Sequence, residues 1–138
     1  MPTTEIDHEG LAAAVAAIPA GSPVYMINLL RFRDQADYGD DTEFLPCTGR
    51  EAYFTRYLPT FNETVQPYGT TELVFGGNVI SQVVGPSDEA WDGIGLVRYP
   101  SIEAFQNLIA DSAYLVKAEP HRVAALADWR LYATTSLM

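Results

Sequence analysis

The stretch Val24–Phe32 (VYMINLLRF) constrains the possible fold more than any other part of the chain. It is rich in residues that strands favour, and successive side chains of a strand point to opposite faces of the sheet. One face would carry Val24, Met26, Leu30 and Phe32, and the other Tyr25, Ile27 and Leu29. Both faces are apolar, which predicts a strand buried on both sides. Asn28, at its centre, is the polar exception.

The other segments predict elements on either side of this strand. Apolar spacing and turn residues place them as follows: a helix over about 8–18, a helix over Thr48–Val65, strands over Glu72–Val84 and Trp91–Tyr99, a helix after Ser101, a helical turn over Pro120–Ala127 and a strand over Trp129–Thr134. Without the first helix the order is β-α-β-β-α-β, which is the ferredoxin-like order of an α+β fold. The sequence therefore predicts one domain over 1–138, with an extra N-terminal helix and a core over about 22–135.

A fold of this order has helices on one face of its sheet only, so the other face is expected to alternate polar residues outward. The doubly apolar strand Val24–Phe32 does not fit that expectation, because its second face needs a cover. The simplest cover is a second copy of the chain laid sheet to sheet. We expect a homodimer formed through the β-sheet face.

Charge and composition exclude several classes of function. Eight basic against eighteen acidic residues give a net charge of −10, which disfavours nucleic acid and anionic membranes as partners. The apolar run Leu11–Ile18 has no preceding basic segment and is too short to span a bilayer, so we expect a cytoplasmic protein. Cys47 is the only cysteine, and no His/Cys/Asp spacing or dinucleotide fingerprint predicts a metal site or a cofactor.

Several segments resemble an uncharacterised bacterial family, the domain of unknown function thirteen-thirty of the dimeric α+β barrel superfamily. They are VYMINLLRFR, GREAYFTRYL, WDGIGLVRYPSIEAF and DSAYLVKAEPHRVAALADWRLYAT, and the similarity extends over roughly residues 22–135. The resemblance implies a ferredoxin-like protomer that pairs through its sheet. It also implies a small-molecule cavity between the sheet and the helices, without naming a substrate.

Asn28 is the first candidate site residue. In haem-degrading members of the superfamily, an asparagine of the first strand works in the cavity with a histidine on the last long helix. Asn28 matches that asparagine, but Lys117 and Ala118 stand where the histidine is expected, and His121 follows a few residues later. The resemblance therefore does not carry haem degradation over. The alternative for Asn28 is a buried amide bonded to the backbone.

Glycines and tyrosines predict where a cavity would lie. Gly93 and Gly95 fall on one face of their strand and leave a depression, either for a close-packed helix or for a cavity floor. Tyr53 and Tyr57, one helical turn apart, could form the facing wall or belong to the core.

Charged and aromatic residues at the strands complete the candidate site. Arg31 and Arg98 would need partners if buried, and could pair at strand ends or hold a carboxylate or enolate. Trp91 is a further candidate for ligand contact, with core or interface packing as its alternative. His121 is expected on a surface turn, where it would be a general base with an ordinary pKa near neutrality.

Together these features predict a small-molecule-binding dimeric α+β barrel protein. Its enzymatic form would be a cofactor-independent monooxygenase or isomerase acting on an aromatic or polyketide-like compound. In that form Asn28 and Arg31 would stabilise an oxyanion, and His121 or a tyrosine would move the proton. Ligand contacts would come from Asn28, Tyr53, Tyr57, Trp91 and Arg98. The alternative is a non-catalytic accessory or structural homodimer.

Overall fold

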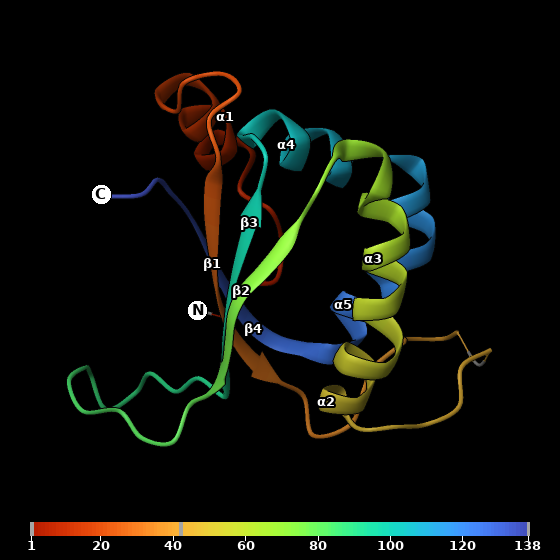
Figure 1. Ribbon diagram of the computed structural model, residues 1–138. Coiled ribbons are helices and arrows are strands. Elements are labelled where there is room, and N and C mark those ends of the chain that lie inside the picture. Colours follow the sequence, from red (N-terminus) through yellow and green to blue (C-terminus); the bar gives the residue numbers. More distant parts are fainter. Residues whose placement is uncertain (1, 42, 138) are drawn as a thin grey trace.

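The computed structural model describes residues 2–41 and 43–137, and its centre is one antiparallel sheet (Figure 1). The strands are β1 (Val24–Phe32), β2 (Glu72–Asn78), β3 (Gly93–Tyr99) and β4 (Leu126–Thr134). Their order across the sheet is β2-β3-β1-β4, so β1 and β3 are central and β2 and β4 lie at the edges. The α+β class and the sequence order of strands and helices agree with the prediction.

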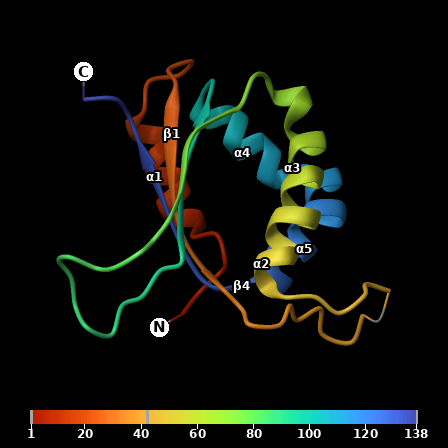
Figure 2. The same cartoon turned by 60° about the horizontal axis from the view of Figure 1, so that its bottom comes forward.

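The helical segments lie mainly to one side of the sheet in both views (Figures 1 and 2). Their bounds are α1 (His8–Ala17), α2 (Gly49–Glu51), η1 (Ala52–Tyr57), α3 (Leu58–Val65), η2 (Gln66–Tyr68), α4 (Ile102–Ala110), η3 (Tyr114–Ala118) and α5 (Glu119–Ala125). The segments α2, η1, α3 and η2 follow one another without a break, as do η3 and α5. No helix in the described part of the chain is long and apolar enough to cross a membrane.

Local side-chain chemistry explains where the helices begin. Thr48 and Glu51 form the capping box that their spacing predicts, each accepting from the other's backbone N–H. Ser101 caps α4 by accepting from the N–H of Ala104 at 3.1 Å. Pro59 and Pro120 each fall in the first turn of an α-helix, directly after a π-helical segment. The α-helix that follows needs no backbone N–H at these positions, so it loses no hydrogen bond to proline.

The core lies between the sheet and the helices. The even-numbered side of β1 supplies Val24, Met26 and Leu30, which pack with the fully buried Ile102, Leu108 and Leu126. Burying such side chains contributes about 1.5–3 kcal/mol each to the free energy of folding. The alternation seen in the sequence therefore sets which face of β1 meets the helices.

The opposite, helix-free face of the sheet is apolar along its centre, as predicted for the strand Val24–Phe32, and carries Glu72, Arg98 and Arg130 toward its ends and edges. The strand register places these side chains on it: Tyr25, Ile27, Leu29, Phe75, Ile94, Leu96 and Tyr132. Phe75 and Tyr132 are 58% and 57% exposed. At one end of this face Trp91 contacts Arg31 and Arg130.

The strand that was predicted over Glu72–Val84 ends early, which corrects the sequence analysis. β2 stops at Asn78, whose pairing partner Gly93 is the first residue of β3. Residues 79–92 form a long loop that extends away from the helices in both views (Figures 1 and 2). Its apolar side chains Ile80, Val83 and Val84 are more than 90% exposed. They therefore belong to a projecting loop and not to the sheet.

Candidate functional site

A cavity of about 560 Å³ lies between the sheet and the continuous helical segment α2–η1–α3. It is lined by residues of three strands, of this segment and of the turn before β2: Asn28, Leu30, Phe32, Arg50, Tyr53, Phe54, Leu58, Phe61, Asn62, Thr71, Leu73, Gly76, Gly77, Asn78, Gly93, Ile94, Gly95 and Val97. Most of these are apolar, and a few polar groups interrupt them. This composition is typical of small-molecule sites.

Glycines open the floor of the cavity. Gly95 pairs with Asn28 on one side and with Gly76 on the other, so all three share the helix-facing side of the sheet. A Cβ at Gly95 would come no nearer to another residue than 3.8 Å, the distance to Asn28 Cβ. The missing side chain is therefore replaced by open space and not by a close-packed helix. Of the two alternatives for Gly93 and Gly95, this geometry favours the cavity floor.

Aromatic rings form the facing wall. Tyr53 lies 5.6 Å from Phe32 and 5.4 Å from Phe54, measured between ring centroids, and Phe61 lines the cavity further along. Burial raises the pKa of Tyr53 well above its ordinary value. Its hydroxyl therefore stays protonated near neutral pH and can serve as a hydrogen-bond donor, but not as a base.

Asn28 lines the cavity and also bonds to its own scaffold. Its Nδ2 donates to the carbonyl of Gly95 at 3.2 Å, and its Oδ1 accepts from the indole Nε1 of Trp129 at 3.0 Å. A side-chain amide has two donors and one acceptor oxygen, so much of its capacity is used inside the protein. Both alternatives from the sequence, the cavity amide and the buried structural amide, apply to this one side chain.

We expect Asn28→Ala to lower the free energy of unfolding by about 1–3 kcal/mol, because the indole N–H of Trp129 and the carbonyl of Gly95 lose their partner. Urea unfolding followed by circular dichroism measures the change. Asn62→Ala is the matched control, since that amide lines the same cavity but is exposed. Equal stability of the two variants would show that the bonds of Asn28 contribute nothing to folding.

Arg50 stands at one end of the cavity and is its only charged lining residue. Its guanidinium lies over the rings of Phe32 and Phe54, at 5.0 and 5.6 Å from their centroids, and donates to Asn78 Oδ1 at 3.3 Å. The ion pairs of the described residues involve other arginines, namely Arg122 and Arg130. The sequence analysis missed Arg50, because its place opposite β2 follows only from the packing of α2 on the sheet.

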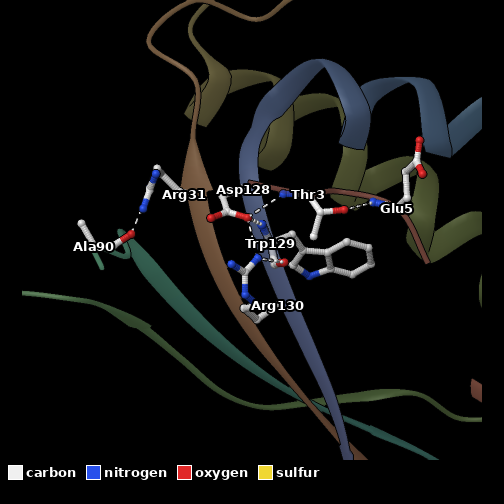
Figure 3. Close-up of polar contacts among 7 residues, drawn as sticks. All are labelled: Thr3, Glu5, Arg31, Ala90, Asp128, Trp129 and Arg130. Carbon is white, nitrogen blue, oxygen red and sulfur yellow. Dashed lines mark hydrogen bonds and ion pairs between the residues drawn. The ribbon is translucent and has the colours of Figure 1, made fainter. Parts of the chain in front are cut away.

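Three of the predicted site residues lie outside the cavity, on the other side or at an edge of the sheet. Arg31 donates from Nε to the carbonyl of Ala90 at 3.0 Å (Figure 3). The ring of Trp91 lies between the guanidinium groups of Arg31 and Arg130, at 5.7 and 5.1 Å. Arg98 pairs with Tyr25 and Glu72 across the sheet, so it shares the helix-free face. The structure groups Arg31 with Trp91 but brings neither near Asn28.

Hydrogen bonds of Asp128 link the edge strand β4 to the N-terminal segment beside this group. Asp128 is 4% exposed and accepts from the backbone N–H of Thr3 at 2.9 Å and from Arg130 at 2.6 Å (Figure 3). Although burial alone would raise the pKa of Asp128, these hydrogen bonds and the one from the N–H of Trp129 lower it below its ordinary value. Asp128 thus fixes the start of the chain against β4.

Tyr57 belongs to the core and does not line the cavity. It is 7% exposed, and its hydroxyl lies 3.0 Å from that of Tyr114. Burial, followed by the neighbouring tyrosines, raises its pKa well above the ordinary value. Of the two predicted tyrosines, only Tyr53 therefore reaches the candidate site.

His121 is buried and not on an exposed turn, which corrects the expectation from the sequence. It is 8% exposed on α5, its Nδ1 lies 2.7 Å from the hydroxyl of Tyr38, and Phe44 packs edge-on against its ring. Burial first, and then the charge of Arg56, lower its pKa. His121 holds Tyr38 and Phe44 against α5 and is not among the residues that line the cavity.

We expect folding stability to fall as the pH is lowered through about 6.5, the ordinary pKa of histidine in an unfolded chain. The pKa of His121 is lower in the folded protein, so between the two values the unfolded state binds more protons and is favoured. Urea midpoints measured from neutral pH to about pH 5 test this. His121→Gln should flatten the dependence, whereas His8→Gln should not; a full dependence in His121→Gln would contradict the assignment.

A metal centre is not apparent in the described part of the chain. No group of three or more His, Cys, Asp or Glu side chains is placed to hold a metal ion there. Cys47 is partly buried and unpaired.

Fold and cavity together define an α+β protein with a cavity between its sheet and the segment α2–η1–α3. Comparison with solved structures adds a family. The RPA0582 protein of unknown function from Rhodopseudomonas palustris is 33% identical, with a TM-score of 0.84, over 100% of this chain and 99% of that one. A crystal structure of methylated RPA0582 protein gives the same identity and TM-score over 99% and 96%. The chain belongs to the family of RPA0582. No protein-family model and no curated protein matches it.

Proposed function

We propose that this protein binds a small molecule in the cavity beside Asn28, as a ferredoxin-like member of the dimeric α+β barrel superfamily. The narrower family assignment, domain of unknown function thirteen-thirty, is part of the same proposal. Support comes from the β-α-β-β-α-β order, from the strand order β2-β3-β1-β4 and from helices gathered on one side of the sheet.

The observation that carries the proposal is the cavity itself. Its volume of about 560 Å³ falls within the roughly 300–1,000 Å³ of typical ligand sites. Asn28 and Tyr53 stand in its wall instead of packing against each other without a void. A purely structural homodimer, the alternative function, gives no reason for glycines to keep this space open.

We also propose that two copies pair through the helix-free face. Phe75 and Tyr132 are exposed on this face, and the loop 79–92, which extends away from the helices (Figure 1), carries Ile80 at 91% exposure. Two such faces would bury each other's apolar surface, which favours association. Sedimentation of the wild type at micromolar concentration should give a dimer, and Phe75→Asp should shift it toward monomer.

The cavity lining supports catalysis less well than it supports binding. Among the described lining residues there is no carboxylate or histidine, and the raised pKa of Tyr53 keeps its hydroxyl protonated near neutral pH. In a monooxygenase or isomerase acting on an aromatic or polyketide-like compound, Tyr53 would donate to an oxyanion, and the substrate or water would supply the base. Asn28 would first have to give up a bond, because its Nδ2 already donates to the carbonyls of Gly95 and Met26. Binding requires no such base.

The proposed binding site is tested by filling the cavity with a large side chain that projects from its floor. A phenylalanine at position 95 would project into the open space beside Asn28. We expect Gly95→Phe to remain folded and to lose the thermal stabilisation that cavity ligands give the wild type in a screen of aromatic compounds. Gly10→Ala, on an exposed position of α1 outside the lining, controls for a change of glycine as such. Ligands that stabilise Gly95→Phe as much as wild type would contradict binding at this site.

A further inference from the structure

We propose that the cavity binds an elongated, planar aromatic carboxylate, with the carboxylate at Arg50 and a hydroxyl-bearing end at Thr71. This inference rests on the proposed function, whose ligand class it specifies. It follows from three properties of the lining, which are its single charge, its flat shape and an unsatisfied hydroxyl at the far end.

The charge of the cavity is positive and confined to one end. Arg50 is its only charged lining residue, although the chain as a whole carries a net charge of −10. A guanidinium has five N–H donors, and the side-chain hydrogen bond that Arg50 makes within the described protein uses one of them, toward Asn78. The rings of Phe32 and Phe54 contact its face and leave its edge for a ligand. A carboxylate accepts from that edge through two parallel bonds.

The shape of the cavity selects a flat ligand. Its floor is the glycine surface of β2 and β3, where Gly76 and Gly95 add no side chain, and its opposite wall consists of the rings of Tyr53, Phe54 and Phe61. On β3 the lining runs from Gly93 to Val97, four steps or about 13 Å along a strand, and along β2 Thr71 and Asn78 are seven steps or about 23 Å apart. An aromatic ring system fits between a flat floor and a wall of rings, where stacking adds to the burial of apolar surface.

The far end of the cavity offers an unsatisfied hydroxyl. Thr71 directly precedes β2, whose other end is Asn78, so Thr71 and Arg50 stand at opposite ends of the cavity. The Thr71 Oγ1 atom is buried and has no hydrogen-bond partner in the described structure. Buried polar atoms usually have a partner, and a ligand hydroxyl would supply one.

The probes separate these features. trans-4′-Hydroxystilbene-4-carboxylic acid is an elongated planar molecule that carries the carboxylate, two aromatic rings and the distal hydroxyl; its carboxamide lacks the charge, and trans-stilbene-4-carboxylic acid lacks the hydroxyl. Titration calorimetry near neutral pH should give the wild type a lower Kd for the hydroxy acid than for either analogue. We expect the amide to bind about tenfold more weakly, since hydrogen bonds to charged groups are the stronger ones.

Two variants locate the contacts. Arg50→Gln should weaken binding of the hydroxy acid about tenfold and leave the amide unchanged. Lys117→Gln removes one charge from an exposed position outside the lining and should change neither. Thr71→Val keeps the shape of the side chain and should weaken binding of the hydroxy acid but not of trans-stilbene-4-carboxylic acid.

The outcomes distinguish the ligand class from the site. Equal binding of acid and amide, or an Arg50→Gln variant that behaves like Lys117→Gln, would overturn the carboxylate assignment while leaving the cavity as a binding site. Failure of every probe to bind the wild type would overturn the aromatic class. Binding that persists in a folded Gly95→Phe variant would place the probe elsewhere and overturn the proposed function itself.

Discussion

Replacing Gly49 by alanine is expected to cost at least about 3 kcal/mol of folding free energy, which is at the severe end for a single substitution. A Cβ at this position would lie 2.3 Å from the carbonyl oxygen of Arg33 and 2.6 Å from that of Ala125. Both are backbone atoms and cannot rotate away as a side chain could. The end of β1, the end of α5 and the start of α2 meet at this glycine, so relieving the overlap would move all three.

The hydrogen bonds around Gly49 explain why the chain cannot adjust easily. The N–H of Gly49 donates to the carbonyl of Arg33 at 3.0 Å, and the N–H of Arg33 donates to the carbonyl of Ala125 at 2.8 Å. Urea unfolding of Gly49→Ala measures the loss, with Gly76→Ala as the matched control, because a Cβ there meets nothing nearer than 3.6 Å. Equal midpoints for the two variants would contradict this account.

How far the sequence predicts this structure depends on the range of the interactions involved. Thr48 and Glu51 are three residues apart, so their reciprocal bonds follow from local geometry, and the predicted capping box is present. The parity of Gly93 and Gly95 likewise follows from the period of a strand, and both line the cavity. Ile80 and Val83 have strand-like composition, yet no strand is available to pair with them, and they lie in an exposed loop.

Predicting the site was harder, because it is assembled from distant segments. Arg50 reaches the cavity only through the packing of α2 beside β2, and nothing in its neighbours marks it. His121 was interpreted as a surface residue after Pro120, but Tyr38 and Phe44, some eighty positions earlier, bury it. Asn28 was identified because it interrupts an apolar alternation. Its partner Trp129 lies 101 residues away and could not be inferred from that pattern.

Replacing Arg122 by alanine is the other substitution with a large expected effect, a loss of about 3–5 kcal/mol. The side chain is almost fully buried, at 3% exposed. Its Nε donates to the Tyr114 hydroxyl at 3.2 Å, its Nη1 donates to the carbonyl of Thr4 at 2.6 Å, and its guanidinium lies 4.5 Å from the ring centroid of Trp129. Truncation would leave a cavity, and the Tyr114 hydroxyl and the Thr4 carbonyl would lose their hydrogen-bond partner.

The ion pair with Glu119 is a small part of that effect. Its atoms are 3.4 Å apart and the Glu119 side chain is 36% exposed, so solvent screens the pair and Glu119→Gln should lose less than about 1 kcal/mol. Arg122→Lys keeps the positive charge but loses the planar guanidinium group. Its loss of folding free energy should lie between those of Arg122→Ala and Glu119→Gln. Urea unfolding of the three variants measures their free energies of unfolding and so tests this order. If Glu119→Gln destabilised the protein as much as Arg122→Ala, the arginine would act through its carboxylate partner and not through Tyr114, Thr4 and Trp129.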